Sequence, residues 1–285
     1  MSVASQTPIR TARLRQGGTV PVLGQGTWYL GVEPRRRADE IAALRLGLDL
    51  GMTLIDTAEM YAEGAAEELV GEAIAGRRDE TFLVSKVLPQ HATVRGTIAA
   101  CDSSLRRLKT DRIDLYLLHW RGSIPLEQTL DAFAALVKAG KIRHWGVSNF
   151  DVEDMEELSS LSGGDNVATD QVLYNLTRRG IEWDLLPWCK ERQIPVMAYS
   201  PVEQGRLLSH PELQRVADRH HATAGQVALA WVLRTEGVIA IPRARTLSHV
   251  RDNRAAVDIS LTSQDIADLD RAFPPPRAKR PMEML

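Results

Sequence analysis

The sequence predicts an α/β fold, a (β/α)8 barrel of the TIM type in which eight parallel strands alternate with helices. Short apolar runs alternate with amphipathic stretches of helix length, a pattern typical of a parallel sheet. Eight such units fit into 285 residues, and the barrel typically takes about 250. The main alternative is a doubly wound open sheet. The turn after the first run, residues 24–29, disfavours it: GQGTWY lacks the glycine spacing of a dinucleotide-binding turn.

The predicted elements cover most of the chain. Glycines directly after helical stretches, such as Gly51 and Gly140, mark helix ends. A single barrel domain is expected over residues 1–285, with a β-hairpin at 9–20 and an extra helix and tail at 262–285. Strands are expected at residues 22–26, 53–56, 82–86, 113–119, 142–148, 167–172, 195–200 and 238–241. Helices are expected at 38–50, 94–108, 126–139, 224–233 and 247–257.

Composition excludes several classes of protein. The chain has 35 Lys and Arg residues against 37 Asp and Glu residues, so nothing points to a nucleic acid or a membrane as partner. The longest apolar run, 227–233, is far shorter than the roughly 20 residues of a spanning helix, and residues 1–18 contain no apolar signal region. The two cysteines, Cys101 and Cys189, have no metal-ligand spacing. We therefore expect a cytoplasmic protein without a metal.

Polar residues end three neighbouring predicted strands. Asp56, Lys86 and His119 lie at strand ends two, three and four, and Tyr61 follows Asp56 by five residues. Barrel enzymes carry their chemistry at these strand ends. An Asp56–Lys86 ion pair is expected there, with the ammonium lowering the pKa of Tyr61 so that it acts as a general acid. His119 would orient a carbonyl oxygen. Each residue alone also has a structural explanation, but the grouping of all four argues against coincidence.

These residues lie in motifs that resemble the aldo-keto reductase family. The resemblance covers nearly the whole chain, and stretches 25–29 and 56–61 are most similar to a bacterial branch that reduces methylglyoxal and similar aldehydes. The family's catalytic tetrad falls on Asp56, Tyr61, Lys86 and His119. The other matching stretches are 54–61, 84–87, 114–120, 146–150, 171, 198–201 and 241–244.

The resemblance implies a monomer, as many relatives of this length are, and a nicotinamide cofactor across the barrel mouth: NADPH, with NADH bound more weakly. Ser148, Asn149 and Gln171 match positions that hold the carboxamide, although Asn149 could instead cap a helix at 151–161. Tyr199 matches the aromatic residue that stacks on the nicotinamide ring. The other implied cofactor contacts are Thr27 and Asp56 near the ribose, Ser200, Pro201 and Ile241, and a segment that covers the adenosine phosphate, Arg243, Ala244, Arg245, Thr246, His249, Asp252 and Asn253.

Arg243 is the first candidate for a contact with the 2′-phosphate, because a guanidinium can bind a phosphate through two hydrogen bonds. The chain departs from the family pattern here. Many members have Lys-Ser at Arg243-Ala244, and often Arg or Gln at His249. We therefore expect a moderate preference for NADPH.

The expected function is NADPH-dependent reduction of small aldehydes, 2-oxoaldehydes and aromatic aldehydes to alcohols. Trp28, Tyr61, His119 and Trp120 are expected to line the substrate pocket, and a short loop after Ser200 and a short tail predict an open site. One alternative is a Schiff-base aldolase that uses Lys86 as nucleophile, which a charged lysine beside Asp56 disfavours. The other is a non-catalytic, NADP(H)-sensing regulatory subunit, which the motifs of the bacterial branch disfavour.

Overall fold

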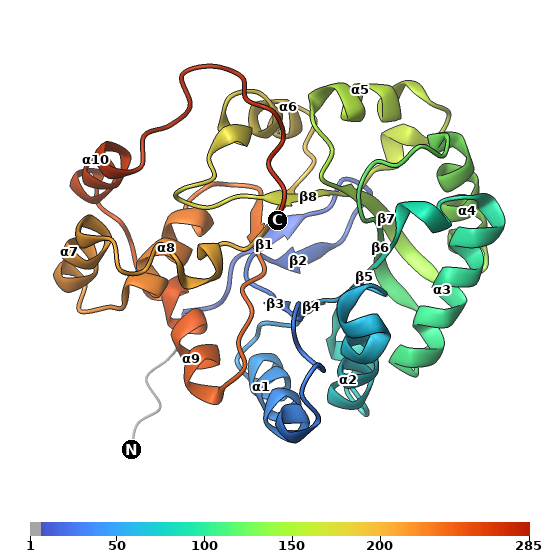
Figure 1. The fold of residues 1–285 in the computed structure, drawn as a ribbon, viewed down its shortest axis with the longest axis horizontal. Coiled ribbons are helices and arrows are strands. Elements are labelled where there is room, and N and C mark those ends of the chain that lie inside the picture. Colours follow the sequence, from blue (N-terminus) through green and yellow to red (C-terminus); the bar gives the residue numbers. More distant parts are fainter. Residues whose placement is uncertain (1–6) are drawn as a thin grey trace.

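The chain folds into a closed barrel of eight parallel strands, so the predicted fold class is confirmed (Figure 1). The computed structural model describes residues 7–285. The predicted domain and the segment searched for a signal both include residues 1–6, which lie outside the described residues. Leu23 bridges to Ala240 and Gly26 to Arg243, which joins the first barrel strand to the last. The barrel strands, in both chain and spatial order, are β3 (Gln25–Gly26), β4 (Leu54–Asp56), β5 (Phe82–Val87), β6 (Ile113–Leu118), β7 (Ile142–Ser148), β8 (Asp170–Leu173), β9 (Val196–Tyr199) and β10 (Val238–Ala240).

Helices surround the barrel on its outside (Figure 1). The stretches with clear helical periodicity form helices close to the expected bounds, whereas α2, α6 and α7 were not predicted. These three have at most nine residues each, and α7 is mostly polar, with only Leu213, Val216 and Ala217 buried. The helices are α1 (Arg37–Asp49), α2 (Ala65–Ala73), α3 (Val94–Leu108), α4 (Leu126–Lys138), α5 (Val152–Ser160), α6 (Leu185–Glu191), α7 (Pro211–Arg219), α8 (Ala224–Leu233), α9 (Leu247–Ala255) and α10 (Ser263–Ala272).

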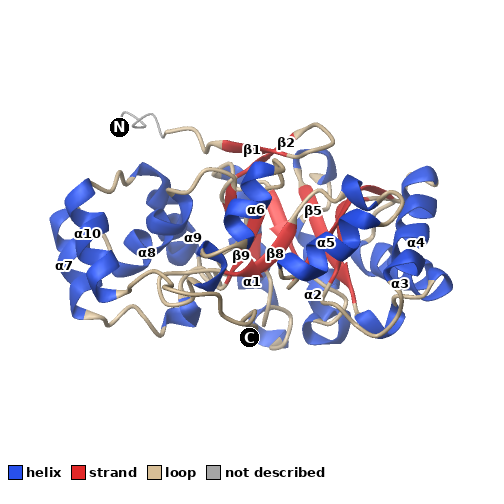
Figure 2. Ribbon diagram, turned by 90° about the horizontal axis from the view of Figure 1, so that it is seen from above, coloured by secondary structure: helices blue, strands red, loops and turns tan. Residues whose placement is uncertain are grey.

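The two ends of the barrel are covered by different parts of the chain. The antiparallel hairpin of β1 (Thr11–Arg13) and β2 (Thr19–Pro21) lies across one end, and the C-terminus lies at the opposite end (Figure 2). Val20 of the hairpin is buried in the core. After α10 the tail returns across the barrel and ends in front of its centre (Figure 1). No helix within residues 7–285 is long and apolar enough to cross a bilayer.

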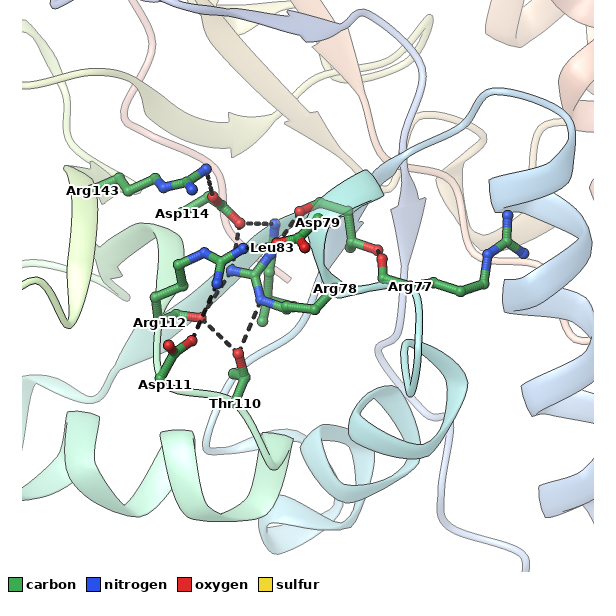
Figure 3. A network of polar contacts seen from close by, with 10 residues as sticks. Arg77, Arg78, Asp79, Leu83, Thr110, Asp111, Arg112, Asp114 and Arg143 are labelled. Atoms are coloured by element: carbon green, nitrogen blue, oxygen red, sulfur yellow. Dashed lines mark hydrogen bonds and ion pairs between the residues drawn. The ribbon is translucent and has the colours of Figure 1, made fainter.

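A buried carboxylate ties three strands together at the end of the barrel where the strands begin (Figure 3). Asp114, the second residue of β6, is 1% exposed. Its Oδ2 accepts hydrogen bonds from the backbone N–H of Leu83 in β5 (2.9 Å) and from Arg78 (2.6 Å). Its Oδ1 accepts from Arg143 of β7 at 2.7 Å. Two cations and a backbone amide therefore compensate the burial of this charge.

Asp114→Ala is expected to lower the free energy of unfolding by about 3–5 kcal/mol, because it leaves the partly buried Arg78 without its carboxylate. Urea unfolding, followed by circular dichroism, measures the change. Asp79→Ala is the matched control: Asp79 also pairs with an arginine, Arg112, but is 94% exposed, and its loss should leave stability nearly unchanged. Equal losses in the two variants would contradict a structural role for the buried carboxylate.

Candidate active site

Lys86 lies fully buried at the opposite end of the barrel, and its ammonium group has three hydrogen-bond acceptors. Nζ donates to Asp56 Oδ2 (2.8 Å), to the carbonyl oxygen of Thr57 (2.8 Å) and to Tyr61 Oη (3.1 Å). An ammonium has three protons, so each finds a partner. Burial lowers the pKa of Lys86, and the charge of Asp56 opposes this. The expected ion pair is present, and its geometry fits the charged form of the lysine.

Tyr61 is presented to the site by a tight turn after β4. Its ring lies 4.7 Å from Lys86 Nζ and 5.8 Å, edge-on, from the His119 ring. The residues that follow, Ala62 and Glu63, have φ values of 50° and 54°, and Gly64 has 94°. Left-handed backbone is unfavourable for non-glycine residues, so surrounding structure must hold this turn in place.

Burial raises the pKa of Tyr61 well above its usual value, and the charge of Asp56 raises it further. Lys86 is not among the causes of this shift, so the expectation that its ammonium lowers the pKa of Tyr61 stays a prediction, while the net shift is upward. The loss of solvation is the main cause of the net shift, and Asp56, 2.8 Å from the ammonium, offsets part of the ammonium's field. The phenol consequently keeps its proton at neutral pH, as a proton donor must. The hydrogen bond from Lys86 can then stabilise the phenolate that forms when the proton leaves.

His119 follows β6 and is neutral. Burial and the nearby charge of Lys86 lower the pKa of its imidazole well below 6.5. Its Nδ1 is buried without a hydrogen-bond partner, which leaves Nε2 as the nitrogen that can face the cavity that His119 lines. The ring also lies against Trp120, with 5.0 Å between centroids. A neutral imidazole in this position can donate one hydrogen bond to a carbonyl oxygen.

A chain of hydrogen bonds connects the tetrad to the polar residues on the next strands. Gln171 Nε2 donates to the second carboxylate oxygen of Asp56 (2.8 Å), and the backbone carbonyl of Gln171 accepts from Ser148 Oγ (2.7 Å). Asn149 Nδ2 donates to that same Oγ (3.0 Å), and Tyr199 Oη donates to Asn149 Oδ1 (2.9 Å). The three residues expected to hold a carboxamide, with Tyr199 beside them, thus form one cluster.

Two of the candidate residues, Asn149 and Thr246, lie near the start of a helix. Asp151, not Asn149, caps α5, since its side chain accepts from the backbone N–H of Asp154 at 2.9 Å. Asn149 instead adopts a φ of 59° and turns its amide toward the cavity. Thr246 caps α9 by accepting from the N–H of His249. Its hydroxyl is therefore engaged in the helix start.

A cavity of about 860 Å³ opens at this end of the barrel. Most predicted site residues line it, but Lys86, Ala244, Arg245 and Thr246 do not: Lys86 lies beneath the cavity wall, and Arg245 is directed toward residues 29–40. The predicted residues in the lining are Thr27, Trp28, Asp56, Tyr61, His119, Trp120, Ser148, Asn149, Gln171, Tyr199, Ser200, Pro201, Ile241, Arg243, His249, Asp252 and Asn253.

Sequence reasoning missed part of the lining. Tyr29 and Met60 neighbour predicted residues along the chain and could have been found from that proximity. Residues 223–226, at the start of α8, are brought in by the fold alone. The tail contributes Met284 and Leu285, and Glu283 anchors it through a 2.7 Å contact with Arg178. The tail therefore forms part of the cavity lining, which the sequence did not indicate, and the expectation of an open site stays a prediction.

The fold and this grouping of Asp56, Tyr61, Lys86 and His119 at the strand C-termini point to one class of protein, a barrel oxidoreductase. The sequence pattern of the Aldo/keto reductase family matches residues 22–273, and the chain belongs to that family.

Similar proteins agree with this assignment. The chain is 53% identical over 272 residues to "Methylglyoxal reductase YeaE" of Escherichia coli (strain K12), covering 94% of this chain and 96% of the relative. It is 34% identical to "Glyoxal reductase" of Bacillus subtilis (strain 168), covering 91% of each. Among solved structures, an aldo-keto reductase from Klebsiella pneumoniae in complex with NADPH is 51% identical, with a TM-score of 0.96 over 98% of this chain and 100% of that one.

Lys86→Met is expected to lower the free energy of unfolding by about 3–5 kcal/mol, because Asp56 would stay buried without its cation. Urea unfolding of Lys86→Met, Asp56→Asn and the double variant checks this. The double variant should lose less than the sum of the two single losses, since both remove the same interaction. Strictly additive losses would mean that the two side chains do not stabilise each other.

Proposed function

We propose that this protein reduces small aldehydes, 2-oxoaldehydes such as methylglyoxal among them, to alcohols with NADPH. The observation that carries the proposal is the Tyr61 hydroxyl, which lies within hydrogen-bond distance of the buried Lys86 ammonium and beside a neutral His119 in the wall of the cavity. Two relatives are named methylglyoxal reductase and glyoxal reductase, and they support the substrate class.

The cavity residues fit a dinucleotide. Ser148, Asn149 and Gln171 offer amide and hydroxyl groups that suit a carboxamide, and the Tyr199 ring is available for stacking. Arg243 is the cation suited to a 2′-phosphate. The first residues of α8 also line the cavity, together with His249, Asp252 and Asn253 of α9, and a helix N-terminus such as that of α8 favours phosphate groups. When bound, the nicotinamide supplies the hydride that reduces the carbonyl carbon.

The four tetrad residues bind the carbonyl group and transfer the proton. His119 donates a hydrogen bond that orients the carbonyl oxygen and polarises it. Tyr61 gives its proton to that oxygen as negative charge develops there. Lys86 stabilises the phenolate left behind through the 3.1 Å contact, and Asp56 keeps the lysine charged and in place. Trp28, packed against Tyr61, and Trp120, packed against His119, form apolar walls beside the reacting group.

The geometry disfavours both alternatives. A Schiff-base aldolase needs a neutral lysine that substrate can reach. Lys86 has 0% exposure and does not line the cavity, and all three of its protons have acceptors. A purely sensing subunit has no need of a protonated phenol beside an ammonium and a neutral imidazole. The complete acid–base geometry therefore favours an enzyme.

The monomeric state and the cytoplasmic location expected from the sequence are retained as proposals. In the described part of the chain Cys101 and Cys189 are both buried and unpaired. Buried free thiols are compatible with a reducing compartment.

Tyr61→Phe tests the proposed reaction, because it removes the proton donor and keeps the ring. Reduction of methylglyoxal is expected to fall by about 10²–10⁴-fold, the usual worth of general acid catalysis, while NADPH affinity stays unchanged. Steady-state kinetics and fluorescence titration measure the two quantities. Tyr116→Phe is the matched control, since its hydroxyl is buried, has no hydrogen-bond partner and lies away from the cavity lining. Turnover of Tyr61→Phe as fast as that of the control would exclude Tyr61 as the acid.

The apolar walls beside the tetrad predict the substrate preference. Trp28, Met60 and Trp120 line the cavity next to Tyr61 and His119, and Lys86 is shielded from it. The catalytic efficiency kcat/KM is therefore expected to be higher for methylglyoxal and benzaldehyde than for a phosphorylated triose or a keto acid, whose charge would be desolvated without a partner. A kinetic panel of these four substrates, read by NADPH absorbance, decides the point. A clear preference for the phosphorylated sugar would refute the prediction.

Arg243→Ala should separate the two cofactors. Loss of a charge-assisted contact with the 2′-phosphate is expected to raise the Kd for NADPH by roughly 10- to 150-fold. The Kd for NADH, which carries a hydroxyl there, should hardly change. Fluorescence titration of both cofactors with both proteins provides the measurement. Equal loss for the two would show that Arg243 does not distinguish them.

A further inference from the structure

Arg245 was expected to contact the cofactor, but its side chain is occupied elsewhere. Its Nη2 donates a 2.6 Å hydrogen bond to the backbone carbonyl of Tyr29, which lies 216 residues earlier in the chain. Its guanidinium also lies 3.7 Å from a carboxylate oxygen of Glu33 and 3.7 Å from one of Glu40. Two carboxylates and a carbonyl therefore surround this cation, and it does not line the cavity.

The partners of Arg245 all belong to one loop and the helix that follows it. The loop, residues 27–33, leaves β3 and leads to α1, on which Glu40 lies almost fully buried. Glu40 Oε2 accepts the backbone N–H of Gly31 at 2.9 Å, while its Oε1 faces Arg245. Arg245 and Glu40 thus hold the loop backbone at two points, the carbonyl of Tyr29 and the amide of Gly31.

This loop needs to be held in place. Tyr29 has a φ of 65°, which is unfavourable for a bulky residue, and its side chain is 49% exposed, so burial does little to fix it. Gly31 has a φ of 77°, and a side chain there would meet the backbone of Ala65 at 2.9 Å. The loop therefore passes directly against the start of α2, the helix that follows the Tyr61 turn.

The fastened loop carries residues of the cavity wall. The Tyr29 ring stacks on Trp28, with ring centroids 4.6 Å apart. The Arg243 guanidinium lies 5.7 Å from the centroid of the same Tyr29 ring. Trp28 is the proposed substrate wall and Arg243 the proposed phosphate contact. A shift of Tyr29 would therefore disturb both, although Arg245 itself does not line the cavity.

We propose that Arg245 is a positioning residue that fastens loop 27–33 to the segment after β10, and thereby fixes the Trp28–Tyr29–Arg243 stack along the cofactor cleft. It does not read the 2′-phosphate. The cofactor consequence rests on the proposed function, whereas the fastening of the loop does not. Arg243 and Arg245, two residues apart, thus have different tasks: the first distinguishes NADPH from NADH, and the second shapes a cleft that both cofactors share.

Arg245→Ala in the full chain separates these tasks. The Kd values for NADPH and NADH should both rise by the same factor, about 10-fold, the lower end of what a charge-assisted hydrogen bond is worth. The ratio of the two Kd values stays at its wild-type value, whereas Arg243→Ala changes it. Arg35→Ala is the matched control, because Arg35 also pairs with Glu33 but is 84% exposed and makes no contact with the loop carbonyl. It should change neither Kd.

A cofactor-free measurement accompanies the titrations. Amide hydrogen exchange in residues 27–33 should become faster in Arg245→Ala, with no change in the strands of the barrel. Glu40→Gln should have the same effect, and the double variant should add less than the sum of both, since the two side chains hold one loop. Unchanged exchange in Arg245→Ala, unchanged cofactor affinity, or a loss confined to NADPH would each overturn the proposal. If wild type failed to bind NADPH, the proposed function would fall, and exchange alone would decide whether Arg245 fastens the loop.

Discussion

The burial of one ammonium group determines how the active end of the barrel is arranged. Lys86 has no exposure to solvent, so its charge must be compensated by neighbours rather than by water. Asp56 provides the counter-charge, and its second oxygen is in turn satisfied by Gln171. Thr57 and Tyr61 accept the remaining protons. The same contacts that make the buried charge tolerable therefore also hold the phenol of Tyr61, the proposed proton donor, beside the ammonium.

The two ends of the barrel show how one kind of interaction serves different purposes. Asp114 is as deeply buried as Asp56, but three donors, two of them on arginines, satisfy it, and it does not line the cavity at the strand C-termini. At the mouth the compensation includes a phenol that borders open space. A buried ion pair stabilises the fold in the first case. In the second it also holds Tyr61, the proposed proton donor, at the strand C-termini, where barrel enzymes generally have their active sites.

The sequence predicts those site residues that lie at strand ends or in local motifs. Asp56, Lys86 and His119 could be predicted because parallel strands bring their ends together. The raised pKa of Tyr61 could not, since it depends on how far Asp56 neutralises Lys86 and how dry the site is. The position of Arg245 also escaped prediction, because its partners lie more than 200 residues away and no local pattern reports them. The tail residues Met284 and Leu285 reach the cavity only through the path of the chain after α10.

The turn after Tyr61 sets thermostability against catalytic geometry. Ala62 and Glu63 adopt left-handed backbone that glycine would tolerate more easily, so the native residues carry a conformational cost. Glycine at either place would relieve that strain and also widen the range of backbone angles open to the segment. The phenol of Tyr61 would then spend less time within hydrogen-bond distance of Lys86 Nζ. The turn is therefore a poor target for stabilising mutations in enzyme engineering, even though two of its non-glycine residues have left-handed backbone. Its fixed conformation positions the proposed proton donor.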